Sequence, residues 1–275
     1  MVIDSHQHFW NYEPVKHSWI GDDMSGIRRD FDPQDIKKEL DANGVHGCVA
    51  VQADQTLAET DFLIRLSEEN DFIKGIVGWV DLRNQKVNGD LERYSAYKKV
   101  KGFRHVVQGE PDPNFLLRPD FRNGITALEK YNFTYDILVF PHQLGATLEF
   151  VKQFPNQKFV IDHLAKPYIK DGFFDGWATL MTEIAEHENV SCKISGMITE
   201  ADYHNWTSDQ LHPYMDMVLN TFGTNRILYG SDWPVCLVAG NYKQVKDIVT
   251  NFIATLSQDE QEDIMGKNAI QFYNL

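Results

Sequence analysis

The first ten residues, MVIDSHQHFW (1–10), join a short apolar run to two histidines, His6 and His8, that are one residue apart. Successive side chains of a β-strand point to opposite faces of the sheet, so residues two apart share a face. Two imidazoles on one face of a buried strand need two sets of polar partners. The stretch therefore predicts a strand whose end meets other polar side chains.

Seven further runs are similarly short, continuous and rich in valine and isoleucine, which is typical of buried parallel strands. They are HGCVAVQ (46–52), IKGIVGWVDL (73–82), VKGFRHVV (100–107), FTYDILVF (133–140), QKFVIDHL (157–164), NVSCKIS (189–195) and NRILYGSD (225–232). Their starts are separated by about the length of one strand and one helix.

Segments with helical periodicity fill the gaps between these runs. DPQDIKKELDANG (32–44) has an aspartate as N-cap candidate, a proline at the first helical position and a closing glycine. Ser257 and Glu260 have the spacing of a capping box and predict the start of a C-terminal helix. The remaining helices are expected within 56–70, 120–132, 142–154, 175–188, 210–223 and 241–256.

Eight strand-like runs that alternate with helices favour an α/β fold, a (β/α)8 barrel forming one domain over residues 1–275. An open doubly wound sheet is less well supported, because no glycine-rich nucleotide-binding motif is present. No low-complexity linker marks a domain boundary. The long stretches 9–31 and 105–119 follow strands and are expected to form loops at the rim of the barrel.

The composition of the 275 residues, 43% hydrophobic and 24% charged, suits one large core. No signal peptide and no apolar stretch of membrane-spanning length is found, so we expect a soluble, cytoplasmic protein. A formal net charge of −14 disfavours nucleic acids and anionic membranes as partners. Three widely spaced cysteines, Cys48, Cys192 and Cys236, favour neither disulfides nor a thiolate zinc site. The sequence leaves a homo-oligomer open.

The active site of such a barrel lies at the C-terminal ends of its strands, so polar residues at those ends are the candidates. They are His6, His8, Trp79, Asp81, Arg104, His105, Asp162, His163, Lys193, Ser195 and Asp232, with His142 and Trp233 just beyond strand ends. Side chains alternate along a strand, so only one of Arg104 and His105 is expected to point into the barrel mouth. Many ionisable groups at one rim are costly unless they are paired or used.

Several of these candidates also have a plain structural interpretation. Asp232 suits a cap or a turn. Lys193 and Ser195 suit the interior of the barrel. The pair of histidines on the first strand favours a functional role, and His163 then supplies a third nitrogen donor.

Three imidazoles and a carboxylate are a suitable ligand set for Zn²⁺ with one coordination position left open. Such an ion generates hydroxide at neutral pH and polarises a carbonyl, while the carboxylate takes a proton. The same histidines could instead stabilise an oxyanion by hydrogen bonds without a metal. The residues leave this choice open.

These residues resemble the motifs of the amidohydrolase superfamily, and the chain is similar in particular to its amidohydrolase-2 lactonase branch. That branch includes hydrolases of L-fuconolactone and L-rhamnonolactone and a pyrone-dicarboxylate lactonase. The resemblance spans the whole chain, in DSHQHFW (4–10), KGFRHVVQGEPDP (101–113), FVIDHLAKP (159–167), ILYGSDWPV (227–235) and GKNAIQFYNL (266–275).

The resemblance implies a barrel in which Asp232, assisted by His163, is the catalytic base that activates water against a lactone carbonyl. The implied ligands of one divalent metal, zinc above all, are His6, His8, His163 and Asp232; without a metal the three histidines would bind the carbonyl oxygen directly. The implied substrate contacts are Arg104, His105, His142, Trp79 and Trp233. The fourth strand ends in arginine and histidine rather than in the lysine that bridges two metals, so a binuclear centre is not expected.

A neutral sugar-acid lactone is the favoured substrate. A pyrone dicarboxylate would need several converging arginines, whereas Trp10, Trp79 and Trp233 suit a hydroxylated ring. Three alternatives stay open: a pyrone-dicarboxylate-type lactonase, a metal-dependent decarboxylase of an aromatic acid, and a non-catalytic barrel that binds a metal or a sugar.

Overall fold

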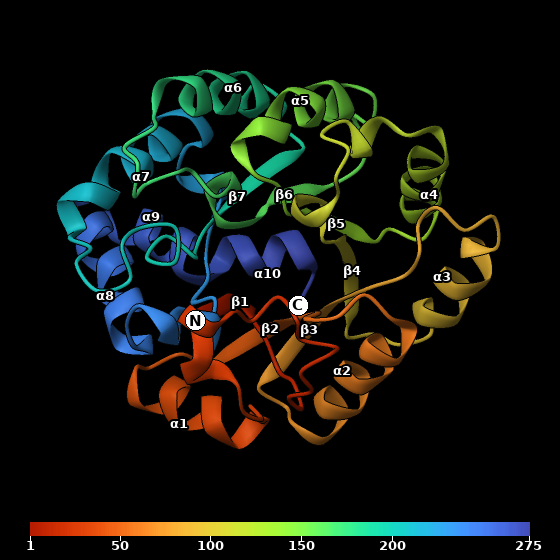
Figure 1. Cartoon of the computed structure of the whole chain (residues 1–275), viewed down its shortest axis with the longest axis horizontal. Helices are drawn as coiled ribbons and strands as arrows, with labels where there is room; N and C mark the ends of the chain where they lie inside the picture. Colours follow the sequence, from red (N-terminus) through yellow and green to blue (C-terminus); the bar gives the residue numbers. More distant parts are fainter.

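Eight parallel strands lie side by side in chain order and form the wall of a barrel (Figure 1). The structure is a computed structural model that describes residues 1–275. The strands are β1 (Ile3–Gln7), β2 (Gly47–Val51), β3 (Ile73–Gly78), β4 (Val100–His105), β5 (Thr134–Ile137), β6 (Phe159–Ile161), β7 (Val190–Ile194) and β8 (Ile227–Tyr229). Each lies within one of the eight apolar runs, so the predicted (β/α)8 barrel is confirmed.

β1 and β8 meet in a narrow seam rather than in a regular ladder. Only a few backbone contacts join them, including the bond from His8 N–H to the Trp233 carbonyl (2.7 Å) and that from Asp232 N–H to the His6 carbonyl (2.8 Å). The seam closes the barrel and brings the histidines of β1 next to the segment that follows β8.

The outer helices cover the strands and expose their polar faces. They are α1 (Pro33–Ala42), α2 (Leu57–Glu69), α3 (Val87–Ser95), α4 (Pro119–Lys130), α5 (Leu144–Lys152), α6 (Asp175–Ala185), α7 (Ser208–Phe222) and α8 (Tyr242–Phe252). α1 begins as predicted, because the Asp32 carboxylate accepts from the backbone N–H groups of Gln34 and Asp35. α3 was not predicted; its sequence, VNGDLERYS, contains a glycine and few apolar residues.

The capping box of Ser257 and Glu260 opens α9 (Gln258–Glu262), as predicted. α9 continues through a π-helical turn, η9 (Asp263–Lys267), into α10 (Asn268–Tyr273). Single short turns interrupt the loops: η1 (Asp22–Ile27), η2 (Val107–Gly109), η3 (Phe115–Leu117), η4 (Pro141–Gln143), η5 (Asp162–Ala165), η6 (Thr224–Arg226), η7 (Val235–Val238) and η8 (Ile253–Thr255).

The inside of the barrel is filled, so only one end is open to a ligand. Its apolar interior consists of Ile3, Val49, Val51, Val77, Val160 and Leu228 together with Ala269 and Tyr273 of α10. α10 covers the N-terminal end of the barrel, at the centre of Figure 1. A larger cluster of 67 buried residues packs the strands against the outer helices.

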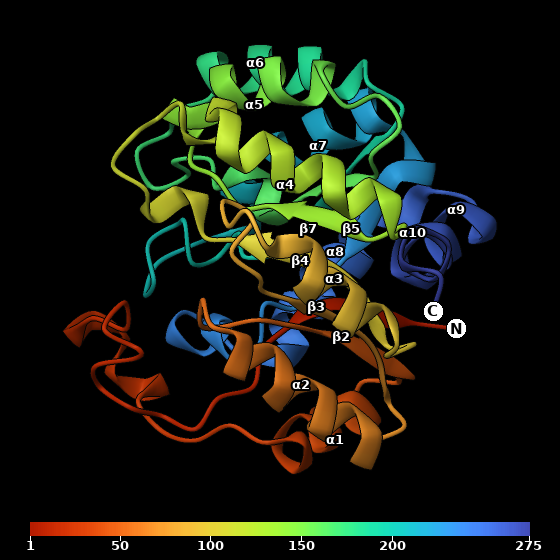
Figure 2. The ribbon, with the colours of Figure 1, turned by 90° about the vertical axis from the view of Figure 1, so that its right-hand side faces the viewer.

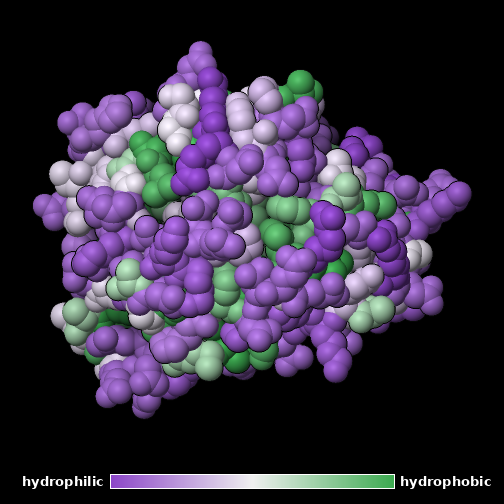
Figure 3. All heavy atoms as spheres, turned by 90° about the horizontal axis from the view of Figure 1, so that it is seen from below, coloured by the Kyte–Doolittle hydropathy of each residue, from purple (hydrophilic) through white to green (hydrophobic).

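The loops gather at the opposite end. In Figure 2 both termini lie at one end of the barrel, and the loop 9–31, in red, projects from the other. The face that carries α1 and α2 is mostly hydrophilic, with small, scattered hydrophobic patches (Figure 3). None of the helices combines the length and the apolar character needed to cross a bilayer.

Candidate active site

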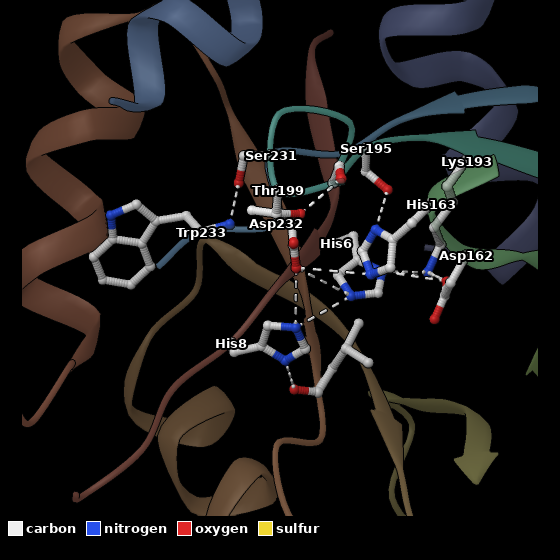
Figure 4. A network of polar contacts seen from close by, with 12 residues as sticks. His6, His8, Asp162, His163, Lys193, Ser195, Thr199, Ser231, Asp232 and Trp233 are labelled. Atoms are coloured by element: carbon white, nitrogen blue, oxygen red, sulfur yellow. Dashed lines mark hydrogen bonds and ion pairs between the residues drawn. The ribbon is translucent and has the colours of Figure 1, made fainter. Parts of the chain in front are cut away.

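Three imidazoles and one carboxylate meet at the C-terminal end of the barrel (Figure 4). His6 lies in β1 and His8 directly follows it, while His163 follows β6 and Asp232 follows β8. The Asp232 Oδ1 atom lies 3.4 Å from the Nε2 of His8, 3.7 Å from that of His163 and 3.9 Å from that of His6. The Nε2 atoms of His6 and His8 are 3.2 Å apart. The structure thus brings together the four residues that the sequence suggested as a centre.

The second ring nitrogen of each histidine has its own partner. The Nδ1 of His8 lies 2.8 Å from the Val51 carbonyl, and the Nδ1 of His163 lies 2.8 Å from the Ser195 hydroxyl. The Nδ1 of His6 lies 3.1 Å from the Lys193 ammonium and 3.2 Å from the Asp162 carboxylate. An imidazole that carries its proton on Nδ1 leaves its Nε2 lone pair free for a cation beside Asp232.

This donor set fits a divalent cation. Zn–N distances of about 2.0–2.1 Å imply donor–donor separations of roughly 3.3–3.4 Å in a tetrahedral site. The Nε2 atoms of His6 and His8, 3.2 Å apart, and the distances of 3.4–3.9 Å from the three Nε2 atoms to Asp232 are close to that range. The donors form two overlapping groups, His6–His8–Asp232 and His6–Asp162–His163, with His6 in both. Arg104 is a competitor, because its Nη1 lies 3.2 Å from the same Nε2 atom of His6.

Two glycines allow the imidazoles to sit this close to the backbone. A Cβ atom on Gly196, whose φ is +61°, would lie 2.6 Å from the His163 ring. A Cβ atom on Gly230 would lie 2.8 Å from the Cβ of His6. Any larger residue at either position would displace a histidine of the centre.

Backbone conformation also sets the positions of His163 and Asp232. His163 opens a left-handed turn of four consecutive residues, 163–166, whose φ angles are all positive, and Asp232 has a φ of 57°. Left-handed conformations are unfavourable for residues other than glycine, so the surrounding contacts must hold them.

Asp4 holds the seam between the two strands that carry most of the centre. Its Oδ1 accepts hydrogen bonds from the backbone N–H groups of His6 (3.1 Å) and Ser231 (2.9 Å), and its Oδ2 accepts from the Tyr242 hydroxyl (3.0 Å). The carboxylate is fully buried. It accepts backbone hydrogen bonds that a strand carbonyl would accept in a regular ladder between β1 and β8.

A buried charge network lies beneath the imidazoles. Arg104 Nη1 donates to Asp162 (2.9 Å), and the Lys193 ammonium contacts Asp162 (2.9 Å) and Asp136 (2.6 Å). The Tyr273 hydroxyl of α10 donates to Asp136 (2.7 Å). The two cations and two carboxylates balance, so the network leaves no uncompensated charge in the barrel.

Burial governs the ionisation of the centre. It lowers the pKa of His163 to about 4 and that of His6 well below its ordinary value, so both imidazoles are neutral at pH 7. Burial of Asp232 would raise its pKa, but its interactions with His163, His8 and His6 outweigh this and hold the pKa below the usual range. Asp232 is therefore a carboxylate at neutral pH.

A cavity of about 390 Å³ opens above the centre. Its floor includes His8, Arg104, His163 and Asp232. Its walls are formed by Lys16, Trp19, Met24, Gln52, Ala53, Asp54, Gln55, Val106, Gln108, Leu138, Lys166, Thr199, Glu200, Tyr203 and Val235. These wall residues come from loops on several sides of the barrel mouth. The volume of the cavity is sufficient for a small cyclic molecule.

Four residues suggested as substrate contacts lie outside this cavity. His105 points away from the barrel mouth, stacks on the Phe115 ring and contacts Glu110 (2.7 Å), as expected if Arg104 points inward. The other three are Trp79, His142 and Trp233. Trp233 is buried, and its indole points away from the imidazoles in Figure 4. Their contact with substrate stays a prediction.

Sequence reasoning missed the loop residues that form the walls. Trp19 is the tryptophan that lines the cavity, rather than Trp10, Trp79 or Trp233. The aromatic and charged content of the 9–31 stretch was the available signal. It could not place Trp19, because that loop is held by a long-range ion pair between Lys16 and Glu59 (2.9 Å).

Comparisons with known proteins identify similar sequences over nearly the full length of the chain. The family model Amidohydro_2, described as amidohydrolase, matches residues 3–275. The chain is 34% identical over 280 residues to the L-fucono-1,5-lactonase of Burkholderia ambifaria, covering 99% of this chain and 95% of that protein. It is 35% identical over 286 residues to the L-fucono-1,5-lactonase of Burkholderia multivorans, covering 99% and 96%.

A solved structure matches over the full length as well. The crystal structure of an amidohydrolase from Burkholderia multivorans with bound zinc has a TM-score of 0.95 and 34% identity, covering 100% of this chain and 99% of that chain.

Proposed function

The chain belongs to the amidohydrolase family, and on that premise we propose that it hydrolyses a sugar-acid lactone of the L-fucono- or L-rhamnonolactone type. The observation that carries the proposal is the convergence of three imidazole Nε2 atoms on the Asp232 carboxylate beneath a cavity of suitable size. The two lactonases at 34% and 35% identity support the reaction class.

The charges of the cavity favour a neutral substrate. Each of its three cationic side chains already has a carboxylate within 3 Å: Lys16 pairs with Glu59 (2.9 Å), Arg104 with Asp162 (2.9 Å) and Lys166 with Glu200 (2.6 Å). A pyrone dicarboxylate or an aromatic acid would bring negative charge to a cavity without an unpaired cation. The dicarboxylate lactonase and decarboxylase alternatives are therefore less favoured.

In the proposed mechanism Asp232 is the general base. Its carboxylate takes a proton from a water molecule whose oxygen forms a bond to the lactone carbonyl carbon. When the bond between that carbon and the ring oxygen breaks, the proton passes from Asp232 to the leaving ring oxygen. The products are the carboxylic acid and the freed hydroxyl group of one open-chain molecule.

The other groups of the centre orient the substrate and stabilise negative charge on its carbonyl oxygen. His8 and His163 line the cavity and orient the carbonyl, whereas His6 is buried beside them, and the Arg104 guanidinium next to His6 supplies fixed positive charge. His6, His8, His163 and Asp232 would hold a divalent metal ion, of which zinc is the first choice, and the ion would supply further positive charge at the carbonyl. The zinc-bound relative supports this choice of ion.

The proposal is tested by ring opening, which releases an acid whatever the substituents. Purified protein, with and without added zinc, is assayed with a pH indicator against aldono-1,4- and 1,5-lactones and 2-pyrone-4,6-dicarboxylate. We expect rapid acid release from a few neutral stereoisomers. Asp232→Asn should reduce kcat by roughly 10²–10⁴-fold, the usual contribution of a general base, whereas Asp216→Asn on the exposed face of α7 should leave it unchanged.

Two results would contradict the proposal. No acid release from any neutral lactone by folded, zinc-supplied protein would reject the lactonase function, and release of carbon dioxide from an aromatic acid would replace it with the decarboxylase. A near-normal rate for Asp232→Asn would reject Asp232 as the base while leaving the reaction class intact.

A further inference from the structure

The left-handed turn that carries His163 also carries a second group into the cavity. Its residues have φ angles of 54° (His163), 52° (Leu164), 56° (Ala165) and 49° (Lys166). In a turn with three residues per repeat, the first and fourth side chains share one face. His163 and Lys166 both line the cavity, while Leu164 and Ala165 are buried in the core. The unusual backbone therefore places Lys166 on the same side as a residue of the centre.

Lys166 is held by a partner from a different loop. Its ammonium lies 2.6 Å from the Glu200 carboxylate, which belongs to the segment that follows β7. The side chains of Lys166 and Glu200 are only 17% and 13% exposed, and both line the cavity. Exposure of this size leaves the pair largely shielded from bulk water but open to a ligand.

The pair is unsuited to binding a carboxylate. The Lys166 charge is already compensated by Glu200, and the nearby ring of Phe140, 5.4 Å from the ammonium, adds no positive charge. The ammonium nevertheless has three N–H donors and the carboxylate has two acceptor oxygens, so their mutual contact leaves donors and acceptors free. An adjacent donor and acceptor match two neighbouring hydroxyl groups, one accepting and one donating.

We propose that Lys166 and Glu200 form a subsite that recognises a pair of hydroxyl groups on neighbouring ring carbons of the substrate. The Lys166 ammonium donates to the oxygen of one hydroxyl, and the Glu200 carboxylate accepts the hydrogen of the other. Hydrogen bonds to charged groups are stronger than neutral ones, so the subsite selects ring stereochemistry. This inference rests on the proposed lactonase function and adds to it two residues that determine specificity.

The test compares substrates as well as variants. Wild type, Lys166→Met and Glu200→Gln are assayed on a hydroxylated aldono-1,5-lactone, on its monodeoxy analogues and on δ-valerolactone, which has no hydroxyl group. The control is Lys170→Met, because Lys170 lies on the same loop in a looser pair with Asp202 (3.7 Å), is 64% exposed and does not line the cavity.

For the hydroxylated lactone, we expect Lys166→Met to lower kcat/KM by roughly 10- to 100-fold, the effect of losing a hydrogen bond to a charged group. Turnover of δ-valerolactone should change less than about twofold, since no hydroxyl group is there to be read. One monodeoxy analogue should be as poor a substrate for wild type as the full lactone is for Lys166→Met, and removing that hydroxyl should cost the variant nothing more.

Equal losses on all substrates, including δ-valerolactone, would overturn the subsite and make Lys166 a structural residue. Unchanged kcat/KM in both variants would overturn it as well. Binding of a hydroxylated δ-lactam, which has the ring hydroxyls but resists hydrolysis, is measured by calorimetry to separate the two proposals. If the protein lacks lactonase activity but binds the lactam in a way that depends on Lys166, the subsite is retained and the proposed function is rejected. If the protein is a lactonase but lactam binding does not depend on Lys166, the proposed function is retained and the subsite is rejected.

Discussion

Asp4 is a buried carboxylate that no cation accompanies. Its hydrogen bonds to two backbone N–H groups and a tyrosine hydroxyl hold β1 against the segment after β8. Burial outweighs these bonds and raises the pKa of Asp4 to about 6, against 3.8 for the ordinary side chain. The buried charge of Asp4 therefore lowers the stability of the fold, whereas its hydrogen bonds align His6 with Asp232.

Replacing Asp4 separates these two effects. Since the folded pKa is the higher one, folding takes up a proton between pH 4 and pH 6, and stability falls as the pH rises through this window. A shift of about two units costs about 3 kcal/mol at neutral pH. Asp4→Asn keeps the carbonyl acceptor without the charge, so we expect it to unfold in urea at pH 8 at the same concentration as wild type or a higher one, with a flatter pH dependence between pH 4 and 6.

The matched variant is Asp4→Ala, which leaves the N–H groups of His6 and Ser231 without an acceptor. We expect it to lose about 2–4 kcal/mol of stability at every pH. If Asp4→Asn were as unstable as Asp4→Ala at pH 8, the ionised carboxylate itself would be what the seam requires.

Single residues also show how much of the site could be predicted from the sequence. His6, His8, His163 and Asp232 could be placed together because strand alternation and the position of strand ends are local features. Trp19 and Glu200 could not, because they lie in loops whose course depends on contacts between distant segments, such as that between Lys16 and Glu59.

Among the elements, the turn 163–166 departs most from local preference. Four non-glycine residues adopt left-handed conformations, each at a cost of roughly 1–2 kcal/mol. The run QKFVIDHL (157–164) predicted a strand to residue 164, yet β6 ends at Ile161. Residue preferences could not predict the turn, because contacts from elsewhere hold it: the Trp177 indole of α6 donates to the Leu164 carbonyl (2.7 Å).

Loss of that indole donor should loosen the turn. Trp177→Phe leaves the buried Leu164 carbonyl without its partner, so we expect kcat for the lactone to fall about tenfold and stability to fall by about 1–3 kcal/mol. The control is Trp206→Phe, which removes a similar bond to the Ala239 carbonyl (2.8 Å) away from the turn. Steady-state kinetics at a temperature where both variants are folded should show the loss of kcat only for Trp177→Phe; equal losses would mean that the bond does not position His163.

On the scale of the whole molecule, the barrel interior holds paired charged side chains in fixed positions. Arg104 from β4 and Lys193 from β7 are balanced by Asp136 from β5 and by Asp162, which directly follows β6, and both cations lie beside His6. The regular alternation of apolar runs and helices predicted the barrel, but it does not predict which interior charges pair. That pairing follows from the closure of the sheet, which brings non-neighbouring strands together.

The fixed charge should limit the affinity for a metal. Two unit charges about 4 Å apart repel by about 4 kcal/mol at the effective dielectric constant of a protein, and the Arg104 Nη1 atom already lies 3.2 Å from the His6 Nε2 atom. We therefore expect Arg104→Met to bind Zn²⁺ at least tenfold more tightly than wild type in calorimetric titrations of chelator-treated protein. Asp162 keeps Lys193 as its partner in this variant (2.9 Å), which should preserve the fold. Arg83→Met, which removes a cation paired with Asp81 outside the cavity, should leave the zinc affinity unchanged. Equal or weaker zinc binding by Arg104→Met would show that Arg104 and the metal do not compete for His6, and that the guanidinium serves the substrate alone.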